Sequence, residues 1–225
     1  MTKSSQAIQS DFDKIALLSD KQWNHNDHYH KFLLGQIPKH CTNALEIGCG
    51  TGRFSRLLAQ RAKQVLAIDL SPNMIDLARL HSTRYANINF QIADAMNVDL
   101  PSEHFDCLVS IATLHHMPCR QAIIRMKQSL KTNGHMVILD MLQTKALAGF
   151  FTNALATLAN LGLTLLKTGR FRAPLSVRKA WAEHGRDEIY LTLAQVRELC
   201  EELLPGAIVK KHLLWRYSIV WQKPG

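Results

Sequence analysis

At residues 45–52 the chain reads LEIGCGTG, an apolar run that leads into a glycine-rich loop. The run over 43–47 is short and apolar, as a buried strand is, and a helical pattern follows over 53–61. Glycine lets the backbone turn tightly and approach a ligand without a Cβ in the way. Open parallel sheets bind ligands where such loops leave the carboxyl ends of their strands. A glycine loop alone is a weak signal, so its meaning depends on what stands at the neighbouring strand ends.

Acidic side chains stand at the ends of the first three predicted strands. Glu46 lies at the end of the first strand, Asp69 ends the second, and Asp94 follows the third. A carboxylate at Asp69 can accept two hydrogen bonds from ribose hydroxyls of an adenosine, and one at Asp94 can accept an adenine amino proton. An acidic rim favours a cationic cofactor over a pyrophosphate, which binds helix N–H groups. The glycines at 48, 50 and 52 also lack the G-x-G-x-x-G spacing of NAD-binding loops.

Short apolar strands alternate with helical patterns along the first 140 residues, which predicts an α/β fold on a parallel sheet. Strands are expected at 43–47, 64–68, 87–91, 105–110 and 135–139. Helices are expected at 10–37, at 53–61, after the cap Ser71-Pro72, and at 121–130, the last ended by Asn133-Gly134. A helix over 192–204, capped by Thr192, precedes strands at 208–214 and 216–222. No crossover helix fits between these two strands, so they must run antiparallel.

The chain has 225 residues, 47% of them hydrophobic, and a formal net charge of +9. This size suits one domain with an appendage and excludes wholesale disorder. The five cysteines include no C-x-x-C pair, which argues against a disulfide framework or a zinc ribbon. The N-terminus has no apolar core, so we expect a cytoplasmic protein. We divide the chain into an N-terminal helical lid (1–40), a cofactor-binding core (41–140), a basic helical insertion capping the substrate (141–190), and a C-terminal helix with two strands (191–225).

Four segments together resemble class I S-adenosylmethionine-dependent methyltransferases of the type 11 family: 46–52, 69–74, 93–95 and 114–116. The resemblance covers about residues 40–140, and the final strand pair extends it to the C-terminus. It implies a Rossmann-like, seven-stranded, mostly parallel sheet with an antiparallel C-terminal strand pair and helices on both faces. It also implies S-adenosylmethionine as the cofactor.

The resemblance further implies where the parts of that cofactor lie. The glycine loop would line the methionine part with Glu46 facing the amino end, Asp69 would hold the ribose, and Asp94 and Ala95 would read the adenine edge. The stretch from Ser110 to His116 would lie beneath the sulfonium. The expected cofactor contacts are therefore Glu46, Gly48, Cys49, Gly50, Gly52, Asp69, Leu70, Met74, Asp94, Ala95 and Ser110.

His115 and His116 follow the fourth strand, at the mouth of the expected site. Methyl transfer needs a general base only where the nucleophile must lose a proton, and histidine suits that role because its pKa lies near neutrality. We predict that at least one of the pair is catalytic or contacts the substrate. The alternative is that a histidine here packs or caps the following loop before Pro118.

A polar aromatic cluster interrupts the N-terminal helical pattern at residues 23–30. His25, His28 and His30 could suggest a metal, but helical spacing puts the first two on one face and the third elsewhere. We therefore predict no metal site. We expect a helix that closes over cofactor and substrate, with His25 and Tyr29 contacting the substrate.

Residues 141–182 contain six basic and no acidic side chains. This composition indicates an insertion over the sheet rather than a further strand–helix unit. Its cationic second half, with Arg170 and Arg172, is expected to bind an amphiphilic or anionic acceptor. Solvated bases on an ordinary helical cap are the alternative. The uncharged run 146–166 is long enough to span a bilayer, but polar residues and glycines dilute it. We predict no transmembrane span and leave peripheral membrane contact open.

These patterns predict an enzyme that transfers a methyl group by in-line displacement to an O, N or C nucleophile of a small molecule with apolar bulk. Alignment of the reacting atoms is the main task of such an enzyme. One alternative is a tRNA methyltransferase, because residues 111–116 are similar to those of wobble-uridine enzymes and the charge is right; no RNA-binding module is apparent. Another is a non-catalytic adenosyl-binding protein, against which the intact acidic residues argue. The oligomeric state is left open.

Overall fold

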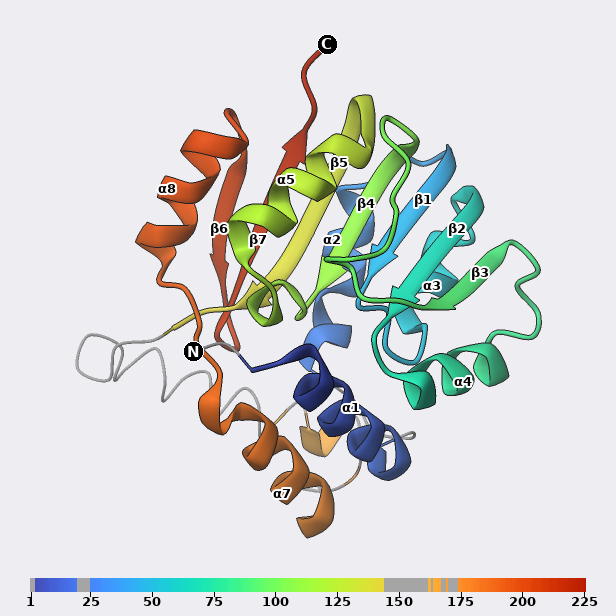
Figure 1. The fold of residues 1–225 in the computed structure, drawn as a ribbon, viewed down its shortest axis with the longest axis vertical. Helices are drawn as coiled ribbons and strands as arrows, with labels where there is room; N and C mark the ends of the chain where they lie inside the picture. The colour runs from blue at the N-terminus through green and yellow to red at the C-terminus, as the bar shows by residue number, and fades with distance from the viewer. Residues whose placement is uncertain (1–2, 20–24, 144–161, 163, 167–168, 170–173) are drawn as a thin grey trace.

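The computed structural model describes residues 3–19, 25–143, 162, 164–166, 169 and 174–225. At its centre is a seven-stranded sheet with the order β3-β2-β1-β4-β5-β7-β6, shown in Figure 1. The strands are β1 (Cys41–Ile47), β2 (Ala62–Asp69), β3 (Ile88–Ile92), β4 (Phe105–Ile111), β5 (Leu130–Met141), β6 (Ile208–His212) and β7 (Arg216–Gln222).

The strand directions confirm the predicted fold class. β1 pairs in parallel with β2 and β4, and the parallel set continues through β3 and β5. β7 runs antiparallel to both β5 and β6, so the predicted antiparallel pairing of the last two strands is correct. β4 is buried at every position but one, as a parallel strand covered on both faces must be.

The junction between α5 (Cys119–Ser129) and β5 differs from the prediction. β5 begins at once with Leu130, so Asn133-Gly134 does not end the helix. Asn133 does have a positive φ of 63°, but it lies in β5, in the stretch where the register against β4 shifts. Asparagine tolerates this conformation better than most residues. The sequence therefore indicated the backbone conformation correctly and assigned it to the wrong element.

Helices cover both faces of the sheet, as Figure 1 shows. One core cluster packs α2 (His30–Gly35), α3 (Arg53–Leu58) and α4 (Pro72–His81) against it. A second cluster packs α5 and α8 (Leu193–Leu203) against it. The predicted caps are confirmed: Ser71 accepts a hydrogen bond from the Met74 amide, and Thr192 forms a capping box at α8.

α1 (Ser5–Ser19) and α7 (Leu175–His184) lie beyond the carboxyl ends of the parallel strands (Figure 1). α1 packs against α4 through Ile15, Ala16 and Met74, with Ala180 of α7 against the same cluster. The single helix predicted over 10–37 is instead α1, the 3₁₀ helix η1 (His25–Tyr29) and α2. The N-terminal segment therefore covers the sheet edge at which open parallel sheets bind ligands. Its action as a lid stays a prediction.

The uncharged run 146–166 lies outside the described residues except for 162 and 164–166. Arg170 and Arg172 also lie outside them. Within the described part of the chain, no helix combines the length and the hydrophobicity needed to cross a membrane.

Candidate active site

The glycine loop leaves β1 with three glycines at positive φ: 74° at Gly48, 51° at Gly50 and 70° at Gly52. A Cβ on Gly48 would come within 2.0 Å of the Thr113 Oγ1 atom, so glycine is required for the close approach of these two loops. A Cβ on Gly50 would meet no atom within 4 Å, because this residue borders a cavity. The loop thus presents bare backbone to a ligand, as predicted from its composition.

Asp69 holds this loop in place from the end of β2. Its Oδ2 accepts a hydrogen bond from the Gly50 amide at 2.8 Å, and its Oδ1 accepts one from the Ser71 amide at 3.0 Å. Burial raises the pKa of Asp69, although the two amides oppose that effect. Each carboxylate oxygen has a second lone pair, so Asp69 can still accept hydrogen bonds from a ligand.

Glu46 is 2% exposed and accepts a hydrogen bond from the Ser55 hydroxyl. Burial raises its pKa to about 8, and the nearby charge of Asp69 adds to this rise. One buried and one half-buried carboxyl group, both with raised pKa values, therefore border one cavity. A cation bound there would favour their charged forms, which is the fit expected for a cofactor with a positively charged sulfur.

Asp94 stands beyond the end of β3, on the same cavity. Its oxygens accept hydrogen bonds from the Met96 amide at 2.8 Å, the Asn97 side chain at 2.9 Å and the Ser5 hydroxyl at 3.1 Å. The last contact joins the start of α1 to the acidic rim.

These residues line a cavity of about 1890 Å³. Ligand pockets commonly measure roughly 300–1,000 Å³, so the space is large enough for a cofactor together with a second molecule. The predicted site residues that line it are Glu46, Gly48, Cys49, Gly50, Asp69, Leu70, Met74, Asp94, Ala95, His115, His116 and His25.

Three predicted site residues lie elsewhere. Ser110 is fully buried inside β4, between Ile47 and Ile138 of the neighbouring strands. Gly52 precedes α3, where an added Cβ would lie 2.8 Å from the Phe90 ring. Neither residue lines the cavity, because each is used for packing within the sheet layers.

Tyr29 is the third, and it does not line the cavity at which its substrate contact was predicted. The residue is 6% exposed, belongs to the core cluster beneath α2 and α3, and donates its hydroxyl proton to the Leu213 carbonyl. Its ring also packs against His28 and His212. Tyr29 therefore ties η1 to the turn between β6 and β7, and of the two predicted lid residues only His25 lines the cavity.

His115 lies in the 3₁₀ helix η2 (Leu114–His116), and Asp140 near the end of β5 fixes its ring. The His115 Nδ1 and the Asp140 Oδ1 are 2.6 Å apart, and the Asp140 Oδ2 accepts the His115 amide at 2.8 Å. This contact favours the tautomer with its proton on Nδ1, which leaves a lone pair on Nε2 when the ring is neutral. Within the described residues, Nε2 is buried and has no hydrogen-bond partner.

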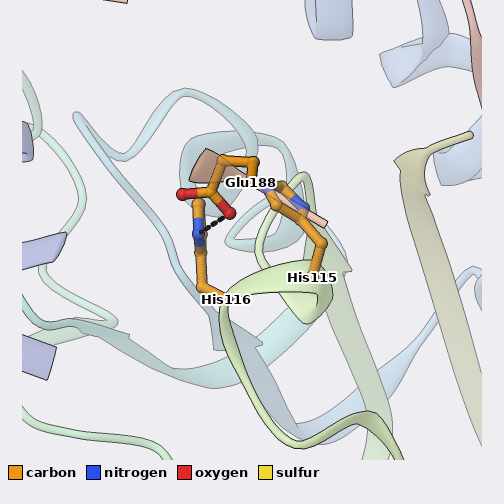
Figure 2. Close-up of side chains that lie close together, drawn as sticks. All are labelled: His115, His116 and Glu188. Atoms are coloured by element: carbon orange, nitrogen blue, oxygen red, sulfur yellow. Dashed lines mark ion pairs between the residues drawn. The ribbon is translucent and has the colours of Figure 1, made fainter. Parts of the chain in front are cut away.

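His116 lies beside Glu188, a residue that sequence analysis did not single out. The His116 Nδ1 and the Glu188 Oε2 are 3.3 Å apart, and Figure 2 shows this ion pair next to His115. Both side chains are almost fully buried. Burial lowers the pKa of His116, whereas the three histidines nearby lower the pKa of Glu188 despite its burial.

The N-terminal helix continues this polar cluster. The His184 Nε2 of α7 lies 3.9 Å from the Glu188 Oε1, and its Nδ1 lies 3.2 Å from the Asp11 Oδ2 of α1. Lys3 pairs with the same Asp11 oxygen at 3.0 Å. The cluster joins residues from α1, α7 and η2, and no spacing in the sequence could have brought them together.

Asp140 could have been found from the sequence. It follows the apolar stretch of β5 and is the last residue but one of that strand, much as Asp69 is the last residue of β2. Because carboxyl ends of parallel strands share one edge, the reasoning that selected Asp69 also applies to Asp140.

Comparisons with known proteins show which proteins the chain is similar to. Residues 45–138 match the model of a family described as a methyltransferase domain. The chain is 28% identical over 208 residues to an uncharacterised methyltransferase of Mycobacterium tuberculosis, covering 91% of this chain and 99% of that protein. It is 31% identical over 160 residues to a ubiquinone biosynthesis O-methyltransferase of Xanthomonas euvesicatoria, covering 62% of this chain and 64% of that one.

A solved structure supports the fold. The N-methyltransferase NodS of Bradyrhizobium japonicum, in complex with S-adenosyl-L-homocysteine, superimposes with a TM-score of 0.67 at 19% identity, covering 97% of this chain and 99% of that one. The family match, the sheet order and the acidic rim around the glycine loop lead to one conclusion. Residues 45–138 match a methyltransferase domain, and these findings together support a class I S-adenosylmethionine-dependent methyltransferase.

Proposed function

We propose that this methyltransferase transfers its methyl group by in-line displacement to an O, N or C nucleophile of a small molecule with apolar bulk, with oxygen favoured. The observation that carries the proposal is a single cavity lined by the acidic residues of the glycine-loop end and by His115 and His116. The bound cofactor supplies a methyl group on a positively charged sulfur, which leaves as a neutral thioether. The side chains around the cavity have to bind both molecules and align them.

At the cofactor end, we assign the loop at Gly48–Gly50 to the methionine part and Asp69 to the ribose. Asp94 and Ala95 read the adenine edge, with Leu70 and Met74 as apolar neighbours. The free lone pairs of Asp69 and the bare backbone at Gly50 support this assignment. Glu46, which also lines the cavity, is assigned to the amino end of the methionine part.

At the acceptor end, the side chains of α1, α7 and η2 favour an apolar small molecule. Phe12 contacts the His116 ring edge-on at 5.5 Å and the Trp181 ring at 6.3 Å, and all three line the cavity. Met117, Leu142 and Val177 add further apolar wall. Since these helices cover the edge of the sheet, the acceptor end suits a compact molecule better than a polynucleotide.

The relatives favour oxygen as the nucleophile. The Xanthomonas protein named above, at 31% identity, is an O-methyltransferase. We assign His115 and His116 to the acceptor rather than to the cofactor, because their ring nitrogens lie beside Asp140 and Glu188.

The test combines cofactor binding with a panel of acceptors. Calorimetry first measures the affinity for S-adenosylmethionine, and a labelled methyl group is then followed into hydroxyaryl compounds, amines, carbon acids and bulk tRNA. We expect transfer to hydroxyaryl compounds with apolar substituents. Transfer to tRNA alone would overturn the proposal, and so would tight cofactor binding with no transfer to any of the small acceptors.

A further inference from the structure

Three side chains at the acceptor end bring their ligand atoms together in the manner of a metal site. His115, His116 and Glu188 each offer one ligand atom, and these atoms lie within 4.8 Å of one another (Figure 2). This is the one such group of three among the described residues. It is a different set from His25, His28 and His30, the residues weighed as metal ligands from the sequence.

The polar atoms of this group are buried and unsatisfied. The His115 Nε2, both ring nitrogens of His116 and the Glu188 Oε1 have no hydrogen-bond partner within the described part of the chain. Native proteins rarely bury polar atoms in this state, because each loses its water without gaining a partner. Several such atoms that face one another indicate a missing ligand that they share.

The separation of His116 and Glu188 fits a common ligand better than a direct hydrogen bond. Their closest atoms, Nδ1 and Oε2, are 3.3 Å apart, and the contact lacks hydrogen-bond geometry. Two ligands bound about 2.0–2.1 Å from one tetrahedral ion lie about 3.4 Å apart. The observed distance therefore matches two positions around a single metal ion.

Asp140 orients His115 as carboxylates orient metal-binding histidines. Its Oδ1 lies 2.6 Å from the His115 Nδ1, which fixes the ring and leaves Nε2 as the nitrogen available to an ion. Ligating histidines commonly bond a carboxylate through their other nitrogen in this way. His184 is placed similarly behind Glu188, with its own Nδ1 held by Asp11.

We propose that the His115 Nε2, a ring nitrogen of His116 and the Glu188 carboxylate bind one divalent transition-metal ion, with an open position facing the cavity. Two imidazoles and one carboxylate suit Zn²⁺ and also Fe²⁺, Co²⁺ or Mn²⁺. Three protein ligands leave room for one more, the usual arrangement of catalytic rather than structural sites. Two of the three side chains, His115 and His116, line the same cavity as the glycine loop.

The ion deepens the proposed function, on which this step rests, by selecting the acceptor class. A hydroxyl oxygen of the acceptor takes the open position, where the ion lowers its pKa and its proton passes to solvent. The oxygen electron pair then forms the bond to the methyl carbon, while the electrons of the carbon–sulfur bond return to sulfur. The products are a methyl ether and a neutral thioether, so the acceptor is a phenol, catechol or enol rather than an amine.

The experiment titrates Co²⁺ and Zn²⁺ into chelator-treated full-length protein, following Co²⁺ by its visible absorption and Zn²⁺ by calorimetry. We expect one ion per chain and Co²⁺ bands of four or five coordination. His116→Ala and Glu188→Gln should each weaken binding by at least tenfold. His40→Ala and Glu198→Gln, which remove the same groups from exposed positions, should leave it unchanged.

Cofactor affinity is measured on the same samples, both to confirm folding and to separate the two proposals. Cofactor binding without metal binding would overturn the metal site and leave the proposed function standing. Metal binding without cofactor binding would overturn the proposed function and leave the metal site standing. Equal Co²⁺ spectra for the wild type, His116→Ala and Glu188→Gln would place the ion elsewhere and overturn the assignment.

Discussion

The two ends of the cavity are assembled from different distances along the chain. At the cofactor end, Asp69 bonds amides 19 residues before it and 2 residues after it, so the segment from the end of β1 through α3 to just past the end of β2 provides both contacts. At the acceptor end, Asp140 reaches His115 across 25 residues, and His184 reaches Asp11 across 173. The cofactor end is mostly backbone held by carboxylates, whereas the acceptor end is made of side chains. Substitutions can therefore change the acceptor end while the cofactor end keeps its geometry.

The largest effect that separates the two ends is expected at His115 and Asp140. His115→Ala should lower kcat by at least about 10²-fold, because it removes an imidazole that lines the acceptor end of the cavity. Asp140→Asn should lower it by about 10–100-fold, since the amide no longer holds the ring in its tautomer. Steady-state kinetics with a saturating acceptor measures both. Calorimetry should show cofactor affinity within about twofold of the wild type; an equal fall in affinity and turnover would show that the ends are not independent.

Gly48 is where the two ends touch, so it offers the next largest effect. Gly48→Ala would put a Cβ 2.0 Å from the Thr113 Oγ1. We expect a loss of about 1–3 kcal/mol in the free energy of unfolding from overpacking, beyond about 1–2 kcal/mol for alanine at positive φ. Gly50→Ala is the matched control, because it has a positive φ but open space around it. Urea denaturation compares the two variants. Equal losses in their free energies of unfolding would mean that the Thr113 side chain moves aside without an energetic cost.

The cofactor end of the cavity could be predicted from the sequence better than the acceptor end, because its residues belong to patterns that are local in the sequence. The runs that form β1, β2 and β3 are local patterns, so Glu46, Asp69 and Asp94 could be placed at one sheet edge before the structure was known. Glu188 could not, because only the packing of η2 against the segment after α7 brings it to His116.

Misplaced residues show a second limit of local patterns. An aromatic residue beside polar neighbours fits a lid and a core equally well, and Tyr29 turned out to be core. Asn133 has the positive φ that the sequence suggested, yet the conformation serves a strand irregularity and not a helix end. In each case the sequence indicated the preference of the side chain or backbone correctly. Tertiary packing then determined which part of the structure the residue belongs to.

Asp69→Ala sharpens the assignment of the cofactor end. It removes the acceptor of the Gly50 amide together with the proposed ribose contact, so cofactor affinity should fall by more than about tenfold. Asp69→Asn keeps one acceptor oxygen and should lose less. Calorimetry measures both variants, and circular dichroism checks that they fold. Unchanged affinity in Asp69→Ala would remove the ribose assignment while leaving the acceptor end untouched.

The pH dependence due to Glu46 gives the smallest expected change, counted per unit of pH. Its pKa of about 8 in the folded protein, raised chiefly by burial, compares with about 4.5 for an ordinary glutamate. Between these values the folded state binds more protons than the unfolded state, so stability from this group is full below about pH 4.5 and is lost as the pH rises toward 8. The slope cannot exceed one proton, about 1.4 kcal/mol per pH unit.

Glu46→Gln isolates this contribution, because glutamine resembles the protonated carboxyl and does not titrate. Urea denaturation should give wild type and variant similar free energies of unfolding near pH 4.5, with the variant increasingly more stable toward pH 8. A cationic cofactor beside Glu46 should favour its charged form, so binding to the wild type near pH 7 should release a fraction of a proton that Glu46→Gln does not release. Calorimetry in buffers of different ionisation enthalpy measures that fraction. Equal proton release by both proteins would mean that the cation does not lie close enough to Glu46 to change its charge.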